Sequence, residues 1–218
     1  MNDFYSKQHR DLQDHHDTHN LADRLQQIIV ENQISDQHQF FIESRDFFFL
    51  TTVDHRGYPT CSYKGGNLGL VRVLDPQTLI FPNYDGNGMF LSMGNIQGNP
   101  KIGMLFIDFE TPHRIRVHGD AFVQVDDPLL SEYPGADGLV RIKISEIFIN
   151  CPRYIHRMQR VESSKYVPQE GQVAPGPQWK RIDALQDVLP VCDQGITKKL
   201  GGIITPEEYG AMVMNGEG

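Results

Sequence analysis

Apolar residues change their spacing near residue 45, and the change predicts two kinds of structure along the chain. In the first part, apolar positions recur at the three- and four-residue steps of one helix face, at Leu21, Leu25, Ile28 and Ile29. Ser35 is placed to cap a second, short helix. Beyond residue 45 the apolar runs become short, rich in β-branched and aromatic residues, and separated by turn residues. The N-terminal part is therefore predicted to be helical and the middle of the chain to be β-sheet.

The middle of the chain contains seven candidate strands, at residues 47–54, 60–63, 68–74, 78–82, 101–109, 113–125 and 138–150. The segment "DHRGYP" that follows the first strand has turn chemistry, so the first two strands are expected to form a hairpin. Short strands at this spacing, joined by turns, are typical of one antiparallel barrel. We therefore predict a mainly β fold with peripheral helices.

The C-terminal part has a different pattern. Residues 163–178 are rich in Pro, Gly and Ser, which predicts a surface loop. The segment 179–189 is expected to be a helix that Pro190 stops. A further helix is predicted after Thr205, which is placed as its N-cap, with Pro206 at the first helical position and Glu208 at the capping-box position.

Composition and charge exclude several classes of protein. The chain has 218 residues and a formal net charge of −8, which argues against bulk binding of nucleic acid or of anionic membranes. No apolar stretch approaches the roughly 20 residues of a membrane span, and the first residues lack the apolar segment of a signal peptide. Three scattered cysteines without a CxxC pattern predict neither a disulfide framework nor a zinc site. We expect a cytoplasmic protein.

Three short segments could together form an anion site. In "SYKGG" (62–66) a predicted strand ends in a lysine and two glycines, which admit a ligand close to the backbone; a plain loop with a surface lysine fits equally well. In "HRIRVHG" (113–119) three basic residues share one strand face, which is either solvated or lines an anion site. "DGNG" (85–88) can begin a short helix whose free N–H groups attract a phosphate.

Other catalytic and metal motifs are missing from the sequence. There is no P-loop, no GxGxxG after a strand, no GxSxG and no obvious nucleophile–base pair, so no catalytic residue is assigned. His15, His16 and His19 could hold a metal on a helix or could simply be solvated. No acidic or cysteine partner is placed to complete such a site, and no metal is predicted.

Four segments in the same order and at similar spacing resemble the pyridoxamine 5′-phosphate oxidase-like proteins, the FMN-binding split barrels. They are "FFFLTTVDHRGYPTCSYKGG", "GLVRVLDPQTLIFPNYDGNG", "GNIQGNPKIGMLFIDFETPHRIRVHGDAF" and "EIFINCPRYIH". The resemblance runs from about residue 41 to about residue 157. It implies an antiparallel split β-barrel of the FMN-binding type, with the flavin at the interface of a homodimer.

The resemblance also implies a cofactor site. Matching the family's motifs gives candidate FMN-binding residues on three segments, at Ser62, Tyr63, Lys64, Gly65 and Gly66, at Asn87, Gly88, Met89 and Asn95, and at Arg114 and Arg116. Residues Cys151, Arg153 and Tyr154 are expected near the site. Many relatives have one or two arginines after the asparagine of the loop, where this chain has Gly88 and Met89. Each lost hydrogen bond to a charged group, at about 1.5–3 kcal/mol, would weaken FMN binding unless another cation compensates.

The resemblance leads us to expect an FMN-dependent oxidoreductase that acts on a small substrate, with NADH or NADPH as a possible electron donor. The alternative is a non-catalytic carrier or sensor of flavin or of a related cofactor, or an empty barrel that serves as an interaction module. True pyridoxamine phosphate oxidases grip their substrate with a C-terminal RxHxR-like segment. Residues 201–218 contain neither arginine nor histidine, so we do not expect that activity. The expected organisation is an N-terminal helical segment packed on the barrel (1–45), the split-barrel domain (46–160) and a C-terminal loop with helices (161–218).

Overall fold

The computed structural model describes residues 4–172 and 174–218. The chain forms two compact units, one that ends at Val161 and one from Glu162 to Gly218. Positions 1–3 and 173, which belong to the expected segments 1–45 and 161–218, lie outside the described residues. The three-part division expected from the sequence stays a prediction.

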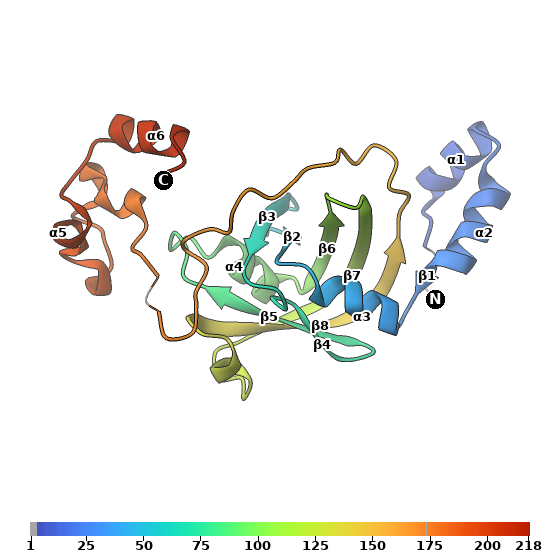
Figure 1. The fold of residues 1–218 in the computed structure, drawn as a ribbon. Coiled ribbons are helices and arrows are strands. Elements are labelled where there is room, and N and C mark those ends of the chain that lie inside the picture. The colour runs from blue at the N-terminus through green and yellow to red at the C-terminus, as the bar shows by residue number, and fades with distance from the viewer. Residues whose placement is uncertain (1–3, 173) are drawn as a thin grey trace. The chain divides into compact units, whose positions relative to one another are not determined.

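The first unit is built on one antiparallel sheet of eight strands (Figure 1). Along the sheet the order is β3-β2-β6-β7-β8-β5-β4, and β1 pairs with β8 beyond this path. The bounds are β1 Val30–Glu31, β2 Phe47–Val53, β3 Pro59–Gly65, β4 Arg72–Asp75, β5 Thr78–Tyr84, β6 Lys101–Asp108, β7 His113–Gln124 and β8 Ala136–Ile149. The predicted fold class, a mainly β antiparallel split barrel with peripheral helices, is confirmed.

Within residues 4–161, four α-helices and a short 3₁₀ turn accompany the sheet. Their bounds are α1 Lys7–His15, α2 His19–Ile29, α3 Asp36–Glu43, α4 Leu91–Gly98 and η1 Leu130–Glu132. The predicted cap of α3 is confirmed, because the Ser35 hydroxyl accepts a hydrogen bond from the His38 backbone N–H at 3.3 Å. No helix in the described ranges is long and apolar enough to cross a membrane.

The core lies on the inner face of the curled sheet. Burial alternates strictly along β2, where Phe48, Leu50 and Thr52 point inward and are almost fully buried. The Phe48 ring packs against those of Phe81 and Phe106 from β5 and β6, with ring centroids 5.0 and 5.6 Å apart. The period-2 pattern of the sequence therefore corresponds to one buried side of a bent sheet.

A bulge in β8, where Ser145 has no partner on β7, allows the sheet to bend. The register of β7 with β8 shifts between His118 and Gly119. A Cβ atom at Gly119 would lie 2.5 Å from the Lys143 carbonyl oxygen, so only glycine fits at this close approach of the two backbones. The bend is thus fixed by the sequence at this position.

One strand is shorter than expected. The apolar run 68–74 was predicted to be a strand, but β4 begins only at Arg72. Gly69 has a φ of +78°, and the Leu70 N–H donates to the Asn67 carbonyl oxygen at 3.0 Å. The first half of the run is therefore a turn, in which apolar side chains are still buried at Leu70 and Val71.

The second unit consists of short helices, with bounds η2 Gln178–Arg181, η3 Asp183–Leu185, η4 Val191–Asp193, α5 Ile196–Leu200 and α6 Pro206–Met214. The continuous helix predicted for residues 179–189 was wrong. Ile182 leaves the helical conformation to pair in parallel with Ile204, and this pairing divides the segment into two 3₁₀ turns. The capping box of α6 is confirmed, because Thr205 and Glu208 each accept a hydrogen bond from the other's backbone N–H.

Candidate functional site

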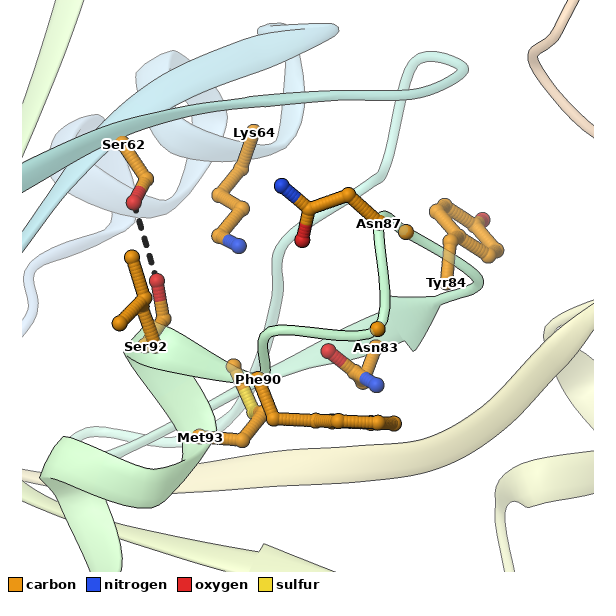
Figure 2. A pocket seen from close by; sticks show the side chains of 11 residues that line it. Ser62, Lys64, Asn83, Tyr84, Asn87, Phe90, Ser92 and Met93 are labelled. Carbon is orange, nitrogen blue, oxygen red and sulfur yellow. Dashed lines mark hydrogen bonds between the residues drawn. The ribbon is translucent and has the colours of Figure 1, made fainter. Parts of the chain in front are cut away.

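An open pocket of about 200 Å³ lies between the end of the β2–β3 hairpin, the end of β5 and the start of α4 (Figure 2). Its walls come from three parts of the chain that are remote in sequence. The lining residues are Ser62, Lys64, Asn83, Tyr84, Gly86, Asn87, Gly88, Phe90, Leu91, Ser92 and Met93. Of the eleven predicted cofactor residues, the structure brings Ser62, Lys64, Asn87 and Gly88 together here.

Strand alternation decides which residues of "SYKGG" reach the pocket. Ser62 and Lys64 point to it, whereas Tyr63 points to the opposite face, is 63% exposed and stacks on Phe47 with ring centroids 5.4 Å apart. Gly65 and Gly66 do not line the pocket. A Cβ atom at Gly66 would lie 2.6 Å from Cδ1 of Leu70, so a larger residue there would displace the end of the Leu70 side chain.

Lys64 is a half-buried cation without a counter-charge. Its side chain points into the pocket toward the space between Ser92 and Asn87 (Figure 2). Burial lowers the pKa of the Lys64 ammonium, and no carboxylate among the described residues offsets this desolvation. An anionic ligand would supply the missing charge.

Two serines form one side of the pocket. The hydroxyls of Ser62 and Ser92 are hydrogen-bonded to each other at 2.9 Å, which ties β3 to the first turn of α4. Ser92 is buried at 7% exposure. Each hydroxyl keeps capacity for a further hydrogen bond, so the pair can also bind a ligand oxygen.

Asn95, another predicted site residue, does not line the pocket. Its side-chain amide donates to the hydroxyls of Thr52 and Thr60, at 3.0 and 3.1 Å, and these two hydroxyls are 2.7 Å apart. Asn95 therefore holds α4 against the β2–β3 hairpin from the inside of the barrel.

The loop before α4 is shaped by two residues with positive φ. Gly88 has a φ of +77°, and Phe90, the residue that precedes α4, has a φ of +49°. The Met89 N–H donates to Oδ1 of Asn87 at 3.1 Å. Met89 itself does not line the pocket, but Phe90 does, and sequence reasoning missed it. The available signal was the run of three large apolar residues, 89–91, beside a glycine-rich loop.

The two predicted arginines lie on the other face of the sheet. Arg114 pairs with Ile107 and Arg116 with Leu105, and neither arginine lines the pocket. Leu105 and Tyr63 both pair with Phe49, and residues that pair across neighbouring strands point to the same face of a sheet. Arg116, the partner of Leu105, therefore shares the outer face of the sheet with Tyr63. Nε of Arg114 is buried without a hydrogen-bond partner. The basic face of "HRIRVHG" is thus separate from the Lys64 pocket within one chain.

The pocket contains few groups that could transfer a proton. No Asp, Glu or His is among the lining residues that the structure describes. The Tyr84 phenol is present, but burial raises its pKa. Outside the pocket, no group of three or more His, Cys, Asp or Glu side chains in residues 4–172 and 174–218 could hold a metal ion. The arrangement is suited to binding an anion beside an apolar surface.

Comparison with known proteins connects this geometry to a family. A sequence model described as "Pyridoxamine 5'-phosphate oxidase" matches residues 34–151, which include all three walls of the pocket. No curated protein matches the chain.

Several solved structures are similar to the chain over about half of its length. HupZ of Group A Streptococcus is 20% identical, with 58% of this chain and 99% of that chain covered, at a TM-score of 0.45. An FMN-binding protein from Syntrophomonas wolfei is 11% identical, with 64% and 97% covered, at a TM-score of 0.42. HutZ, a heme storage protein from Vibrio cholerae, is 17% identical, with 54% and 94% covered, at a TM-score of 0.41.

Proposed function

Because this chain belongs to the pyridoxamine 5′-phosphate oxidase family, we propose that it binds a flavin nucleotide in the Lys64 pocket and acts as a flavin-dependent oxidoreductase on a small substrate. The observation that carries the proposal is the unpaired, half-buried ammonium of Lys64 inside the region matched by the family. A cation that is desolvated without a partner costs stability, and a bound phosphate would offset that cost.

The side chains of the pocket fit the phosphate end of FMN. Lys64 would hold the phosphate by charge. Of the two serine hydroxyls, which are hydrogen-bonded to each other, the one whose proton is not used in that bond would donate to a phosphate oxygen. The side-chain amide of Asn87 lies on the opposite side of the Lys64 ammonium from the serines (Figure 2). Gly86 and Gly88 leave open space beside the backbone, since a Cβ atom at either would meet nothing within 4 Å.

One chain supplies only part of the site, and we propose that a homodimer completes it. A pocket of about 200 Å³ is smaller than the roughly 300–1,000 Å³ of pockets that enclose a drug-sized ligand. The outer face of the sheet carries clustered aromatic rings, at Phe47, Phe49, Tyr63 and Phe109. Arg116 is exposed on the same face. Tyr63 is exposed and the other three rings are partly buried. A partly exposed aromatic cluster with an arginine is the composition of a protein–protein interface.

In the proposed reaction the flavin and the protein have different roles. A bound flavin supplies the capacity to accept and donate hydride. Lys64 and the two serines would fix its phosphate and so orient the ring system against a substrate, which we propose is reduced or oxidised with NADH or NADPH as partner. Three free, exposed cysteines, Cys61, Cys151 and Cys192, fit a reducing compartment, and we propose a cytoplasmic location.

A non-catalytic flavin carrier or sensor is the second candidate. It is favoured by the lining itself, which contains no carboxylate or imidazole within the described residues. A carrier needs only affinity, whereas an oxidoreductase that moves protons needs a group to hold them.

The visible absorption spectrum of the purified protein, followed by titration with FMN and with FAD, tests flavin binding. We expect a flavin spectrum, or saturable binding after addition. Anaerobic addition of NADH or NADPH then separates the two candidates, because bleaching of the bound flavin with repeated turnover requires an oxidoreductase. A protein that binds neither flavin at about 100 μM would overturn the proposal.

A further inference from the structure

Lys64 differs from Lys7 and Lys101 in what surrounds its amine. Nζ of Lys7 lies 2.6 Å from a carboxylate oxygen of Asp11, and Nζ of Lys101 lies 2.8 Å from one of Asp120. Such a partner favours the charged form of an amine. Lys64 has no carboxylate partner among the described residues and is half-buried in the wall of an open pocket. Of these three lysines, Lys64 is therefore the one that breaks no ion pair when its ammonium loses a proton.

The pocket favours the neutral form of this amine. Burial lowers the pKa of the Lys64 ammonium, so a larger fraction of it is neutral near physiological pH than of a solvated lysine. A neutral, partly desolvated amine is the form in which lysine acts as a nucleophile. The other ionisable side chain among the described lining residues is the Tyr84 phenol, whose pKa burial raises. That phenol is uncharged at neutral pH and does not return the amine to its charged form.

Neutral hydrogen-bonding groups lie on both sides of the amine. The hydrogen-bonded pair of Ser62 and Ser92 is on one side of Lys64 and the side-chain amide of Asn87 is on the other (Figure 2). A hydroxyl and an amide can hold a phosphoryl group whether or not Lys64 is charged. Since a water molecule occupies about 30 Å³ in the liquid, the volume of about 200 Å³ suits a compact phosphorylated molecule. The pocket can therefore hold a small phosphoryl compound beside a reactive amine.

We propose that Lys64 is an acylation site, at which the amine takes the acyl group of an acyl phosphate bound in the pocket. The lone pair of Nζ attacks the carbonyl carbon, and the bond from that carbon to the phosphate oxygen breaks. Inorganic phosphate leaves with the electron pair, and the attacking nitrogen loses one proton to water. The amide that forms carries no charge, so acylation removes the single Lys or Arg cation among the described lining residues. The acylation itself is independent of flavin, whereas its effect on flavin affinity rests on the proposed function.

The test is acetylation of the full chain by acetyl phosphate, followed at each lysine by mass spectrometry of peptides. Lys64 should react about tenfold or more faster than Lys7 and Lys101, because the bound donor is held beside its amine. At a low concentration of acetyl phosphate, the rate at Lys64 should rise with pH and level off below the usual lysine pKa. Inorganic phosphate should slow the reaction at Lys64 and not at the other two lysines. Equal rates at the three lysines, or no effect of inorganic phosphate, would overturn the inference.

A second acetyl donor without a phosphoryl group, p-nitrophenyl acetate, separates binding of the donor from reactivity of the amine. Ser62→Ala should slow the reaction of Lys64 with acetyl phosphate several-fold and leave its reaction with p-nitrophenyl acetate nearly unchanged, because only the phosphoryl donor uses the hydroxyl. Ser131→Ala, an exposed change in η1 outside the pocket, is the matched control and should affect neither reaction. If Ser62→Ala slowed both donors equally, the bound acyl phosphate would be refuted.

Flavin titration distinguishes this inference from the proposed function. The chain acetylated at Lys64 should bind FMN about tenfold more weakly than the untreated chain. Lys64→Arg has a guanidinium that stays charged, so the same treatment should not change its FMN affinity. If FMN binds but Lys64 is not acetylated preferentially, the inference fails and the flavin proposal stands. If Lys64 is acetylated preferentially and neither FMN nor FAD binds, the flavin proposal fails and the acylation site stands.

Discussion

The side-chain amide of Asn95, on α4, donates a hydrogen bond of 3.0 Å to the hydroxyl of Thr52, which is buried on β2 at 1% exposure. This contact joins the helix that begins at the pocket to the strand that carries the core. Helix α4 needs such support, since Gly94 and Gly98 make its eight residues poor helix formers.

Replacement of Asn95 with leucine should therefore destabilise the protein. The variant loses two hydrogen bonds to threonine hydroxyls and keeps the Thr52–Thr60 contact, so we expect a loss of about 1–2 kcal/mol in the free energy of unfolding. Urea unfolding measures it. Gln97→Ala, an exposed change on the same helix, is the control and should lie near wild type. Equal midpoints for Asn95→Leu and wild type would contradict the role assigned to the amide.

Lys64→Met should weaken FMN binding about tenfold or more while leaving riboflavin affinity unchanged, because riboflavin lacks the phosphate. The FMN affinity of wild type should fall as pH rises through the Lys64 pKa, which burial holds below the usual lysine value. The phosphate binds the charged ammonium, so this loss of affinity should be absent in Lys64→Met.

Titrations at low and high salt complete this test, since a contact between an ammonium and a phosphate weakens as salt increases. Lys101→Met is the matched control, because Lys101 is exposed on β6 and is paired with Asp120 at 2.8 Å. Riboflavin and FMN binding equally well to wild type would refute the phosphate site.

Asp127→Asn should cost about 1.5–3 kcal/mol at pH 7, since the buried carboxylate of Asp127 accepts two hydrogen bonds from Arg141. These hydrogen bonds lower the Asp127 pKa below its usual range. A depressed folded-state pKa contributes stability above the unfolded-state value, and that stability is lost as pH falls through the folded-state pKa. Urea unfolding between pH 7 and pH 2 should thus show that the free energy of unfolding falls less with decreasing pH in Asp127→Asn than in wild type. The neighbouring exposed Asp126→Asn should behave like wild type in both respects.

Tyr63→Glu should convert the proposed dimer to a folded monomer. Tyr63 is 63% exposed on the outer face of the sheet, so a carboxylate there is tolerated by one chain but would be buried in the interface of two. Sedimentation velocity at micromolar concentration with flavin present measures the change, and circular dichroism reports whether the fold is kept. Tyr58→Glu, at the same exposure in the β2–β3 turn, should leave the dimer intact. A wild-type protein that sediments only as a monomer would refute the interface.

Most of the fold could be predicted from the chain because its determinants are local. Alternation of Phe48, Leu50 and Thr52 with outward residues predicts a strand without knowledge of its partners. The helix expected at residues 179–189 failed because a distant contact overrode a local pattern. Ile182 leaves a helix because Ile204 pairs with it, and a separation of more than twenty residues is invisible to periodicity.

In the candidate site, too, the features set by local sequence could be predicted and those set by distant contacts could not. Ser62 and Lys64 share one face by simple alternation, so their common direction was predictable. The sequence did not indicate which face of the sheet would form the pocket. Arg116 was expected to line the site, but it lies on the opposite face of the sheet. Phe90 lines the pocket with a left-handed backbone that no residue preference predicts for phenylalanine.

The order of the sheet leaves its two end strands without a common partner. Within the described residues β3 pairs only with β2 and β4 only with β5, so no ladder of hydrogen bonds closes the barrel between them. The pocket lies between β3 and the end of β5, beyond the β5 residues that pair with β4, because Ser62 and Lys64 come from β3 and Asn83 and Tyr84 from β5. A ligand held by both walls therefore acts as a removable cross-link, and its concentration would govern how readily the barrel opens.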